Sequence, residues 1–93
     1  MKSGIIPMEL EFIFRDSALK HNVTEADIRH AFKSYRTIRQ FQNRENVYLL
    51  VGFDLKANPI EILYNEFGEN GVNVFHAKAC QDRFLRLLEE GEY

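Results

Sequence analysis

The chain has 93 residues, of which 45% are hydrophobic and 28% are charged. This length and composition are typical of one small globular domain, and they exclude a chain that is disordered throughout. The net charge of −2 lacks the basic excess of most nucleic-acid-binding proteins, so an RNA site would require the positive residues to gather on one surface.

The residue inventory argues against several classes of site. The single cysteine, Cys80, cannot form an intrachain disulfide, and the sequence contains neither a zinc motif nor a histidine pair at metal-binding spacing. No apolar run reaches the ~18 residues of a membrane span, and the N-terminus lacks the pattern of a signal peptide. We therefore expect a cytoplasmic protein without a membrane segment, metal or cofactor. Residues 1–7 are interpreted as a flexible leader, and residues 8–93 as one domain.

The N-terminal third predicts one short extended segment and two helical stretches. Apolar and other residues alternate over residues 9–14, which indicates an extended edge element. Asp16 is expected to cap a short helical stretch over residues 17–20. A longer helix over residues 24–34 should begin with a variant capping box at Thr24.

From residue 36 the apolar period changes to two, which is typical of strands. The predicted strands cover residues 36–42, 47–54, 59–67 and 72–77. Asn70-Gly71 predicts a type I′ hairpin turn before the fourth strand. The last element is a helix over residues 79–90, with apolar residues at helical spacing and Gly91 at its C′ position. The predicted fold is therefore α+β, with N-terminal helices, a four-stranded antiparallel sheet and a C-terminal helix.

If the first two strand connections hold four residues each, the alternation assigns every strand residue to one face of the sheet. The apolar face is expected to take both longer helices and carries Ile38, Val47, Leu49, Val51, Phe53, Ile60, Ile62, Tyr64, Phe75 and Ala77. The opposite face carries Arg39, Phe41, Tyr48, Leu50, Gly52, Glu61, Leu63, Asn65, Phe67, Val72, Val74, His76 and Lys78. Depending on the length of the last hairpin, either Asn65 lies opposite His76 or Glu61 lies opposite Lys78.

The second face collects side chains that suit phosphate chemistry. The candidates are Arg39, Tyr48, Glu61, His76 and Lys78, joined by Arg83 and Arg86 from the last helix. Arginine and lysine can hold a phosphate and stabilise developing charge, while histidine, glutamate or tyrosine can move a proton. A solvated face with cross-strand salt bridges would explain the same residues without chemistry. A hydrogen-bonded structural histidine would likewise explain His76.

Other conspicuous residues have structural interpretations. His21 and His30 are expected to lie apart from His76, separated from it by a helix and several strands. Cys80 begins the apolar stripe of the last helix, which indicates a core residue. Gly52 lies inside a predicted strand, which indicates a bulge or a close approach to its backbone.

Two stretches of the sequence resemble the BrnT-like branch of the RelE superfamily of type II toxins. The first is FRDSALKHNVTEADI, residues 14–28, which is similar to an aromatic residue and a helix followed by a His-Gly-Val motif. The second is VFHAKACQDRFLRLL, residues 74–88, which is similar to the closing strand, the Ala-Arg pair and the arginine-rich helix. With the strands between them, the resemblance covers residues 12–88. It implies a metal-independent ribonuclease that cleaves RNA by attack of the 2′-hydroxyl and is neutralised by an antitoxin encoded nearby.

The resemblance also assigns roles by position. Lys78 stands where the family has an arginine, and Arg83 and Arg86 lie in its basic helix. The implied catalytic residues are Lys78, Arg83, His76 and Glu61, and the implied RNA-binding residues are Arg39, Tyr48 and Arg86. Asn22 replaces the family glycine, a mild change because both residues tolerate left-handed backbone angles.

Two departures from the family pattern favour a second hypothesis. Lysine at position 78 loses the bidentate phosphate geometry of arginine, and leucine and glutamate replace much of the arginine cluster after residue 84. The alternative is a catalytically inactive protein with the toxin fold that binds another protein. It could also form a homodimer through outward-facing apolar residues, namely Phe41, Leu50, Leu63 and Phe67.

Overall fold

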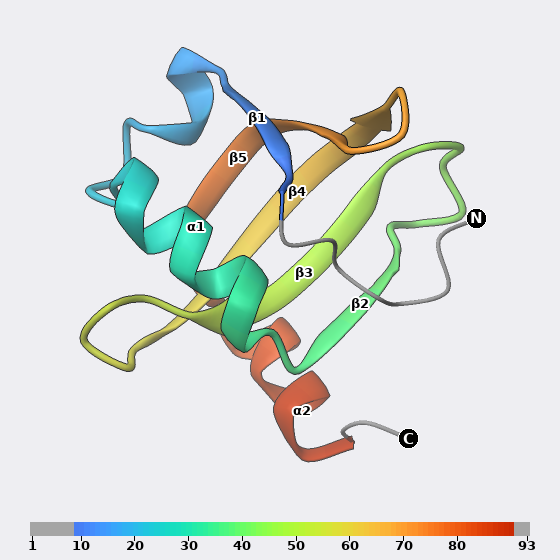
Figure 1. The fold of residues 1–93 in the computed structure, drawn as a ribbon. Helices are drawn as coiled ribbons and strands as arrows, with labels where there is room; N and C mark the ends of the chain where they lie inside the picture. The colour runs from blue at the N-terminus through green and yellow to red at the C-terminus, as the bar shows by residue number, and fades with distance from the viewer. Residues whose placement is uncertain (1–8, 91–93) are drawn as a thin grey trace.

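The computed structural model describes residues 9–90, so the predicted leader and Gly91 lie outside the described residues. In chain order the elements are β1 (Glu11–Phe14), the 3₁₀ turn η1 (Asp16–Ala18), α1 (Glu25–Ser34), β2 (Thr37–Gln40), β3 (Tyr48–Phe53), β4 (Pro59–Phe67), β5 (Gly71–Ala79) and α2 (Asp82–Glu90), as Figure 1 shows. Within the described residues no helix is long and apolar enough to cross a membrane.

The strands form one mixed sheet in the order β1-β5-β4-β3-β2. The α+β class is confirmed, but the predicted four-stranded antiparallel sheet is wrong, because β1 adds a fifth strand parallel to β5. Its pairing aligns Glu11 with Gly71 and Phe14 with Val74. The N-terminal segment thereby lies along the last strand of the sheet.

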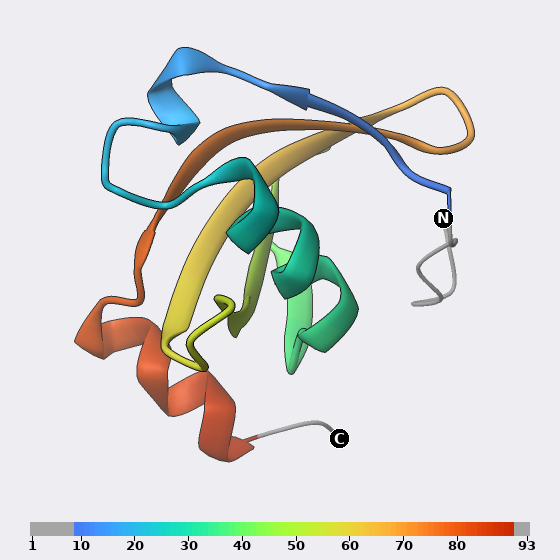
Figure 2. The same cartoon turned by 60° about the vertical axis from the view of Figure 1, so that its left-hand side comes forward.

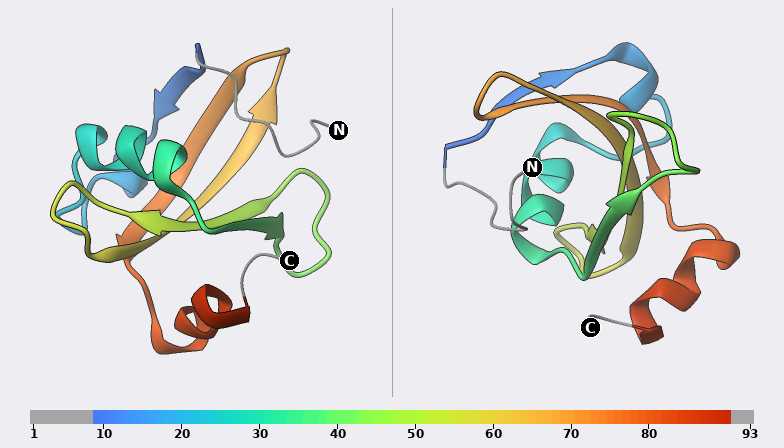
Figure 3. Two further views of the ribbon diagram at one scale, coloured as in Figure 1. Left: turned by 60° about the horizontal axis from the view of Figure 1, so that its bottom comes forward. Right: turned by 90° about the vertical axis from the view of Figure 1, so that its right-hand side faces the viewer.

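The two α-helices lie on opposite sides of this sheet, which curves around α1 (Figures 2 and 3). Ile28, Ala31 and Phe32 of α1 join the main core with sheet residues that include Leu50 and Ile62. In contrast, α2 contacts the other side, where Phe84 packs edge-to-face on Phe41 with ring centroids 6.1 Å apart. The prediction that one face takes both helices is therefore wrong.

The face assignment of β3 is also wrong. Phe53 pairs with Pro59 and Gln40 pairs with Tyr48, one residue away from the predicted register. A shift of one residue exchanges the two faces of a strand. Tyr48, Leu50 and Gly52 therefore face α1, and Leu49, Val51 and Phe53 face the side of α2.

The connection between β3 and β4 explains this shift, since it holds residues 54–58 and not the four residues expected. The Asp54 carboxylate accepts hydrogen bonds from the backbone N–H groups of Lys56 (2.9 Å) and Asn58 (2.8 Å). Ala57 adopts a left-handed φ of 68° to complete the turn. An alanine with positive φ carries no warning in the sequence, because this conformation favours glycine, asparagine or aspartate.

The hairpin between β4 and β5 differs from the predicted type I′ turn. Phe67 pairs with Gly71, and the left-handed residue is Gly68 (φ 60°). Gly71 is needed for space, because a Cβ there would lie 2.4 Å from both the ring and the carbonyl oxygen of Phe67.

Further along the same pair of strands, a register shift between Leu63 and Tyr64 leaves Phe75 as an extra residue on β5. This bulge changes the phase of the strand. Val72 and Val74 therefore join the α1 core, contrary to prediction, while His76 stays on the opposite face. Of the two predicted pairings, the one that places Glu61 opposite Lys78 is observed.

The start of α1 follows the sequence closely. Thr24 Oγ1 accepts the Asp27 N–H at 3.0 Å, and Asp27 accepts the Thr24 N–H at 3.1 Å, so the predicted capping box is confirmed. The second Asp27 oxygen accepts the Leu55 N–H at 3.1 Å. The cap thereby also holds the loop between β3 and β4 against the helix.

Candidate acid–base site

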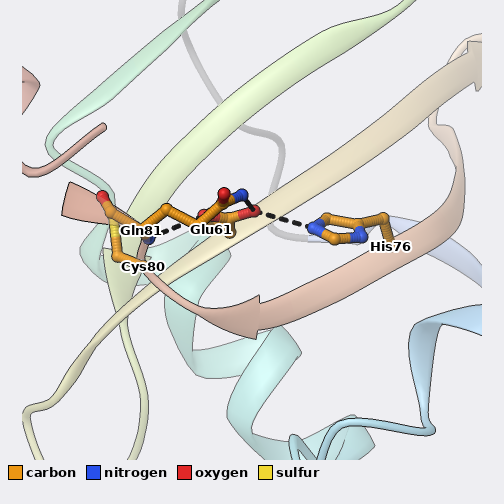
Figure 4. A network of polar contacts seen from close by, with 4 residues as sticks. All are labelled: Glu61, His76, Cys80 and Gln81. Atoms are coloured by element: carbon orange, nitrogen blue, oxygen red, sulfur yellow. Dashed lines mark hydrogen bonds and ion pairs between the residues drawn. The ribbon is translucent and has the colours of Figure 1, made fainter. Parts of the chain in front are cut away.

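Glu61 is a buried carboxylate near the start of β4. Only 1% of the residue is exposed, and a buried charge requires hydrogen-bond partners to offset the lost hydration. His76 Nε2 lies 2.8 Å from Glu61 Oε2. The remaining partners come from Gln81, whose backbone N–H donates to Oε1 at 2.8 Å and whose side-chain amide donates to Oε2 at 2.7 Å. Figure 4 shows the carboxylate lying between Gln81 and the His76 ring.

These contacts determine the charge of Glu61 and the position of the shared hydrogen. Burial raises the pKa of Glu61, but hydrogen bonds from His76 and Gln81 outweigh it and hold this pKa below its usual value. Glu61 is therefore an anion at neutral pH, and an anion accepts hydrogen bonds only. The hydrogen of the shared bond belongs to His76 Nε2, which leaves Nδ1 to exchange protons with a ligand. A quarter of the His76 side chain is exposed.

The same carboxylate fastens the last helix to the sheet. The Gln81 carbonyl accepts the N–H groups of Phe84 (2.9 Å) and Leu85 (3.1 Å), so Gln81 directly precedes the first turn of α2. Glu61 binds the Gln81 N–H, and a negative charge is favourable at a helix N-terminus. Gln81 was not predicted from the sequence, because only the tertiary structure brings it to Glu61.

Lys78 lies directly beside Glu61 on β5 and on the same face of the sheet. The residue is partly exposed. Within residues 9–90 its ammonium makes no ion pair or hydrogen bond. It is therefore available to an anionic ligand that approaches His76.

His21 also lies at this site, and the prediction that it lies apart from His76 is wrong. The centroids of the two imidazole rings are 6.2 Å apart and their planes are inclined by 63°. The parallel pairing of β1 with β5 explains the proximity, because it carries the following residues along the same strand. The Arg15 N–H donates to the Val74 carbonyl at 2.9 Å, and the Ser17 hydroxyl donates to the Phe75 carbonyl at 2.5 Å.

The other predicted site residues do not join this cluster. Tyr48 faces α1, where its ring lies 5.5 Å from that of Tyr64, so it is on the wrong side of the sheet. Arg39 shares the face and the cross-strand row of His76, but three strand spacings of roughly 4.8 Å place it about 14 Å away. Arg83 lies over the Phe84 ring at 4.5 Å, and Arg86 is exposed on α2. The structure thus brings together only Glu61, His76 and Lys78 of the predicted residues.

Neither metal nor thiol chemistry is suggested by the surroundings. Among residues 9–90, no group of three or more His, Cys, Asp or Glu side chains could hold a metal ion. Burial, together with the negative charge of Glu61, raises the pKa of the Cys80 thiol to about 11, so Cys80 is a neutral thiol at physiological pH. Cys80 precedes α2 and is not part of that helix.

The chemistry of this site is inferred from its residues, because the comparisons with known proteins found no relative. No protein-family model, curated protein or solved structure matches this chain. A buried anion that orients a partly exposed imidazole can set its tautomer and stabilise the imidazolium formed during proton transfer. A neighbouring lysine can stabilise negative charge that develops on a phosphate.

Proposed function

We propose that this protein is a metal-independent ribonuclease, a toxin of the BrnT-like branch of the RelE superfamily whose fold is a variant of the RelE-like fold. The observation that carries the proposal is the 2.8 Å contact between the buried Glu61 carboxylate and the partly exposed His76 ring, with Lys78 beside it. The sequence resemblance over residues 12–88 supplies the substrate class.

The chemistry follows from the roles these groups can take. His76 Nδ1 removes the proton of an RNA 2′-hydroxyl, whose oxygen attacks the adjacent phosphorus. Glu61 holds the imidazole in the required tautomer and stabilises the imidazolium that forms. Lys78 stabilises the negative charge on the phosphate oxygens. The bond from phosphorus to the 5′-oxygen then breaks and the 5′-oxygen takes up a proton, so the products are a 2′,3′-cyclic phosphate and a 5′-hydroxyl.

The partner and the location belong to the same proposal. A ribonuclease toxin acts on cytoplasmic RNA and requires an antitoxin protein, which the family resemblance places in a neighbouring gene. The exposed arginines Arg83 and Arg86 on α2 would contact RNA outside the site rather than the scissile phosphate. A short open reading frame for a DNA-binding antitoxin next to this gene would support the assignment.

The direct test is incubation of the purified protein with RNA in EDTA. We expect cleavage that falls about 10²–10³-fold in Lys78→Ala, because a charge-stabilising group is lost. Glu61→Gln should lower the rate by about 10²-fold or more, since the imidazolium loses its anion. Lys33→Ala, at an exposed lysine of α1 on the other side of the sheet, is the matched control and should cleave at the wild-type rate.

Two results would contradict the proposal. Wild-type protein that leaves both RNA and the growth of an expressing bacterium intact would remove the ribonuclease assignment. Cleavage that persists in Lys78→Ala and Glu61→Gln would show that another part of the chain carries the activity.

The alternative, an inactive toxin-fold protein that binds a partner or dimerises, has weaker support. Leu50 is completely buried on the α1 side and Phe41 packs on Phe84, so the four predicted residues do not form one outward surface. Phe67, 40% exposed, remains the main exposed member of that set. Sedimentation separates the hypotheses, because a monomer that cleaves RNA contradicts the binding module.

A further inference from the structure

We propose that His21 is the second proton-transfer group of the site and that it binds the scissile phosphate together with His76. This inference rests on the proposed ribonuclease function. It adds a residue that was expected from the sequence to lie apart from His76. The observation behind it is the pair of imidazole rings from distant parts of the chain, with centroids 6.2 Å apart.

The spacing suits a phosphate shared by two imidazoles. Hydrogen bonds from ring nitrogens to phosphate oxygens are about 2.7–3.2 Å long, so one phosphate can contact a nitrogen of each ring at a centroid separation of 6.2 Å. His21 is exposed and His76 is partly exposed, so both rings can be reached from solvent. Lys78 lies two residues beyond His76 on the same face of β5.

The position of His21 is held by the fold. Ala18 in η1 is completely buried in the core, and the Ser17 hydroxyl bonds the Phe75 carbonyl next to His76. Asn22 then adopts a left-handed φ of 65°, which turns the chain away directly after His21. The ring is thus carried by a segment that is anchored on both sides of the histidine, since Val23 is also buried.

The second histidine completes the proton balance of the cleavage. His76 Nδ1 takes the proton of the 2′-hydroxyl as the bond from the 2′-oxygen to phosphorus forms. His21, as an imidazolium, gives a proton to the 5′-oxygen as its bond to phosphorus breaks. The products are a 2′,3′-cyclic phosphate and a 5′-hydroxyl, and the two histidines end with their protonation states exchanged.

The assignment of acid and base follows from their neighbours. Within the described residues, the titratable groups beside His76 are Glu61 from β4, Lys78 on β5 and His21 from the loop after η1. Of the two rings, His76 is the one whose Nε2 is hydrogen-bonded to a carboxylate within the described residues. Its cation is therefore stabilised when Nδ1 accepts the proton. His21 has no carboxylate partner within the described residues, so an anionic phosphate is the group that would stabilise its cation.

A kinetic comparison of His21→Asn with His30→Asn tests the catalytic role. His30 lies on α1, on the other face of the sheet, and is the matched control. With RNA in EDTA, we expect His21→Asn to lower kcat about 10²–10⁴-fold and to remove the alkaline limb of a bell-shaped pH profile. His30→Asn should retain the rate and both limbs.

A binding experiment tests the shared phosphate independently of turnover. Inorganic phosphate is titrated into protein with ¹⁵N-labelled histidine, and the ring resonances are followed by NMR. We expect His21 and His76 to shift with one dissociation constant while His30 does not move. In His21→Asn the affinity should fall at least about tenfold, the equivalent of one charge-assisted hydrogen bond.

The outcomes separate this inference from the function on which it rests. Cleavage by wild type with an unchanged rate and both pH limbs in His21→Asn overturns the role of His21 and leaves the ribonuclease proposal standing. Phosphate shifts confined to His76 overturn the shared site whether or not RNA is cleaved. Absence of wild-type cleavage overturns the ribonuclease function and with it the proton transfer by His21.

Discussion

The two carboxylate oxygens of Glu61 have different hydrogen-bond partners. Oε1 accepts the backbone N–H of Gln81 and holds the start of α2, while Oε2 meets His76 and the Gln81 amide. We therefore expect a substitution at Glu61 to affect both folding and the proposed activity. Lys78 makes no such bond in the described residues, so its substitution is the cleaner test of catalysis.

Asn22 provides a test of how one backbone conformation places a catalytic candidate. Its φ of 65° lies in the left-handed region, which asparagine tolerates better than most residues. Asn22→Gly should change the free energy of unfolding little, whereas Asn22→Val should cost about 1–2 kcal/mol, because a branched residue is strained in this region. Urea unfolding measures the difference, and ring contacts between His21 and His76 by NMR report the displacement. Equal stability of the two variants would contradict this account.

At the scale of elements, the contact of α1 with β3 depends on one position without a side chain. A Cβ at Gly52 would lie 2.8 Å from the Ala31 carbonyl oxygen and 3.2 Å from the Tyr35 Cα. The close approach that the sequence suggested is therefore confirmed, and the approaching group is the backbone of α1. With a larger residue than glycine at position 52, α1 could not lie as close to the sheet.

Gly52→Ala should lower the free energy of unfolding by about 2–3 kcal/mol, because the helix must move away from the strand. Gly68→Ala is the control, since a Cβ there has no atom within 4 Å. Its cost, on the order of 1 kcal/mol, comes from the positive φ alone. Chemical denaturation gives both values, and hydrogen exchange should show weaker protection of α1 only in Gly52→Ala. Unchanged α1 protection in that variant would contradict the steric argument.

The accuracy of the sequence predictions differed between elements for physical reasons. The capping box at Thr24 and the span of β4 were predicted correctly, because short-range hydrogen bonds and side-chain alternation determine them. The predicted faces of the β3 side chains were wrong, because Ala57 adopts positive φ and the loop between β3 and β4 is one residue longer than expected. The faces of Val72 and Val74 were wrong because of the bulge at Phe75.

At the scale of the whole molecule, the sheet joins the two ends of the described chain. β1 pairs with β5, α1 fills one side, and Glu61 holds α2 to the other side. Two carboxylates with lowered pKa connect elements of the fold. Glu61 holds α2 to the sheet, and Asp27 holds the loop between β3 and β4 to α1. For Glu61 the pKa-lowering bonds come from His76 and Gln81, and for Asp27 from the N–H groups of Leu55 and Thr24.

These groups predict how the stability of the fold depends on pH. A carboxyl whose pKa is lower in the folded protein stabilises it above the unfolded pKa, and this contribution is lost as pH falls through the folded pKa. The free energy of unfolding should therefore decrease on acidification below about pH 4.5, the ordinary value for Glu61. Urea unfolding between pH 7 and pH 2 measures it.

The contribution of Glu61 is separated by substitution. Glu61→Gln should be less stable than wild type at pH 7 and should lose less stability on acidification, because it cannot be protonated. Glu25→Gln, an exposed residue in the first turn of α1, is the control and should keep the wild-type pH dependence. A Glu61→Gln profile parallel to that of wild type would show that the carboxylate does not stabilise the fold.

The sequence by itself determined the α+β class, the limits of α1 and β4, and the residue types from which the site is built. These features depend on neighbours within a few positions along the chain, so local patterns are enough to predict them. Only the tertiary structure decided which side chains share a face and that His21 meets His76. A single left-handed residue or bulge reverses the alternation of a strand, and the parallel pairing of β1 with β5 joins segments that no local pattern connects.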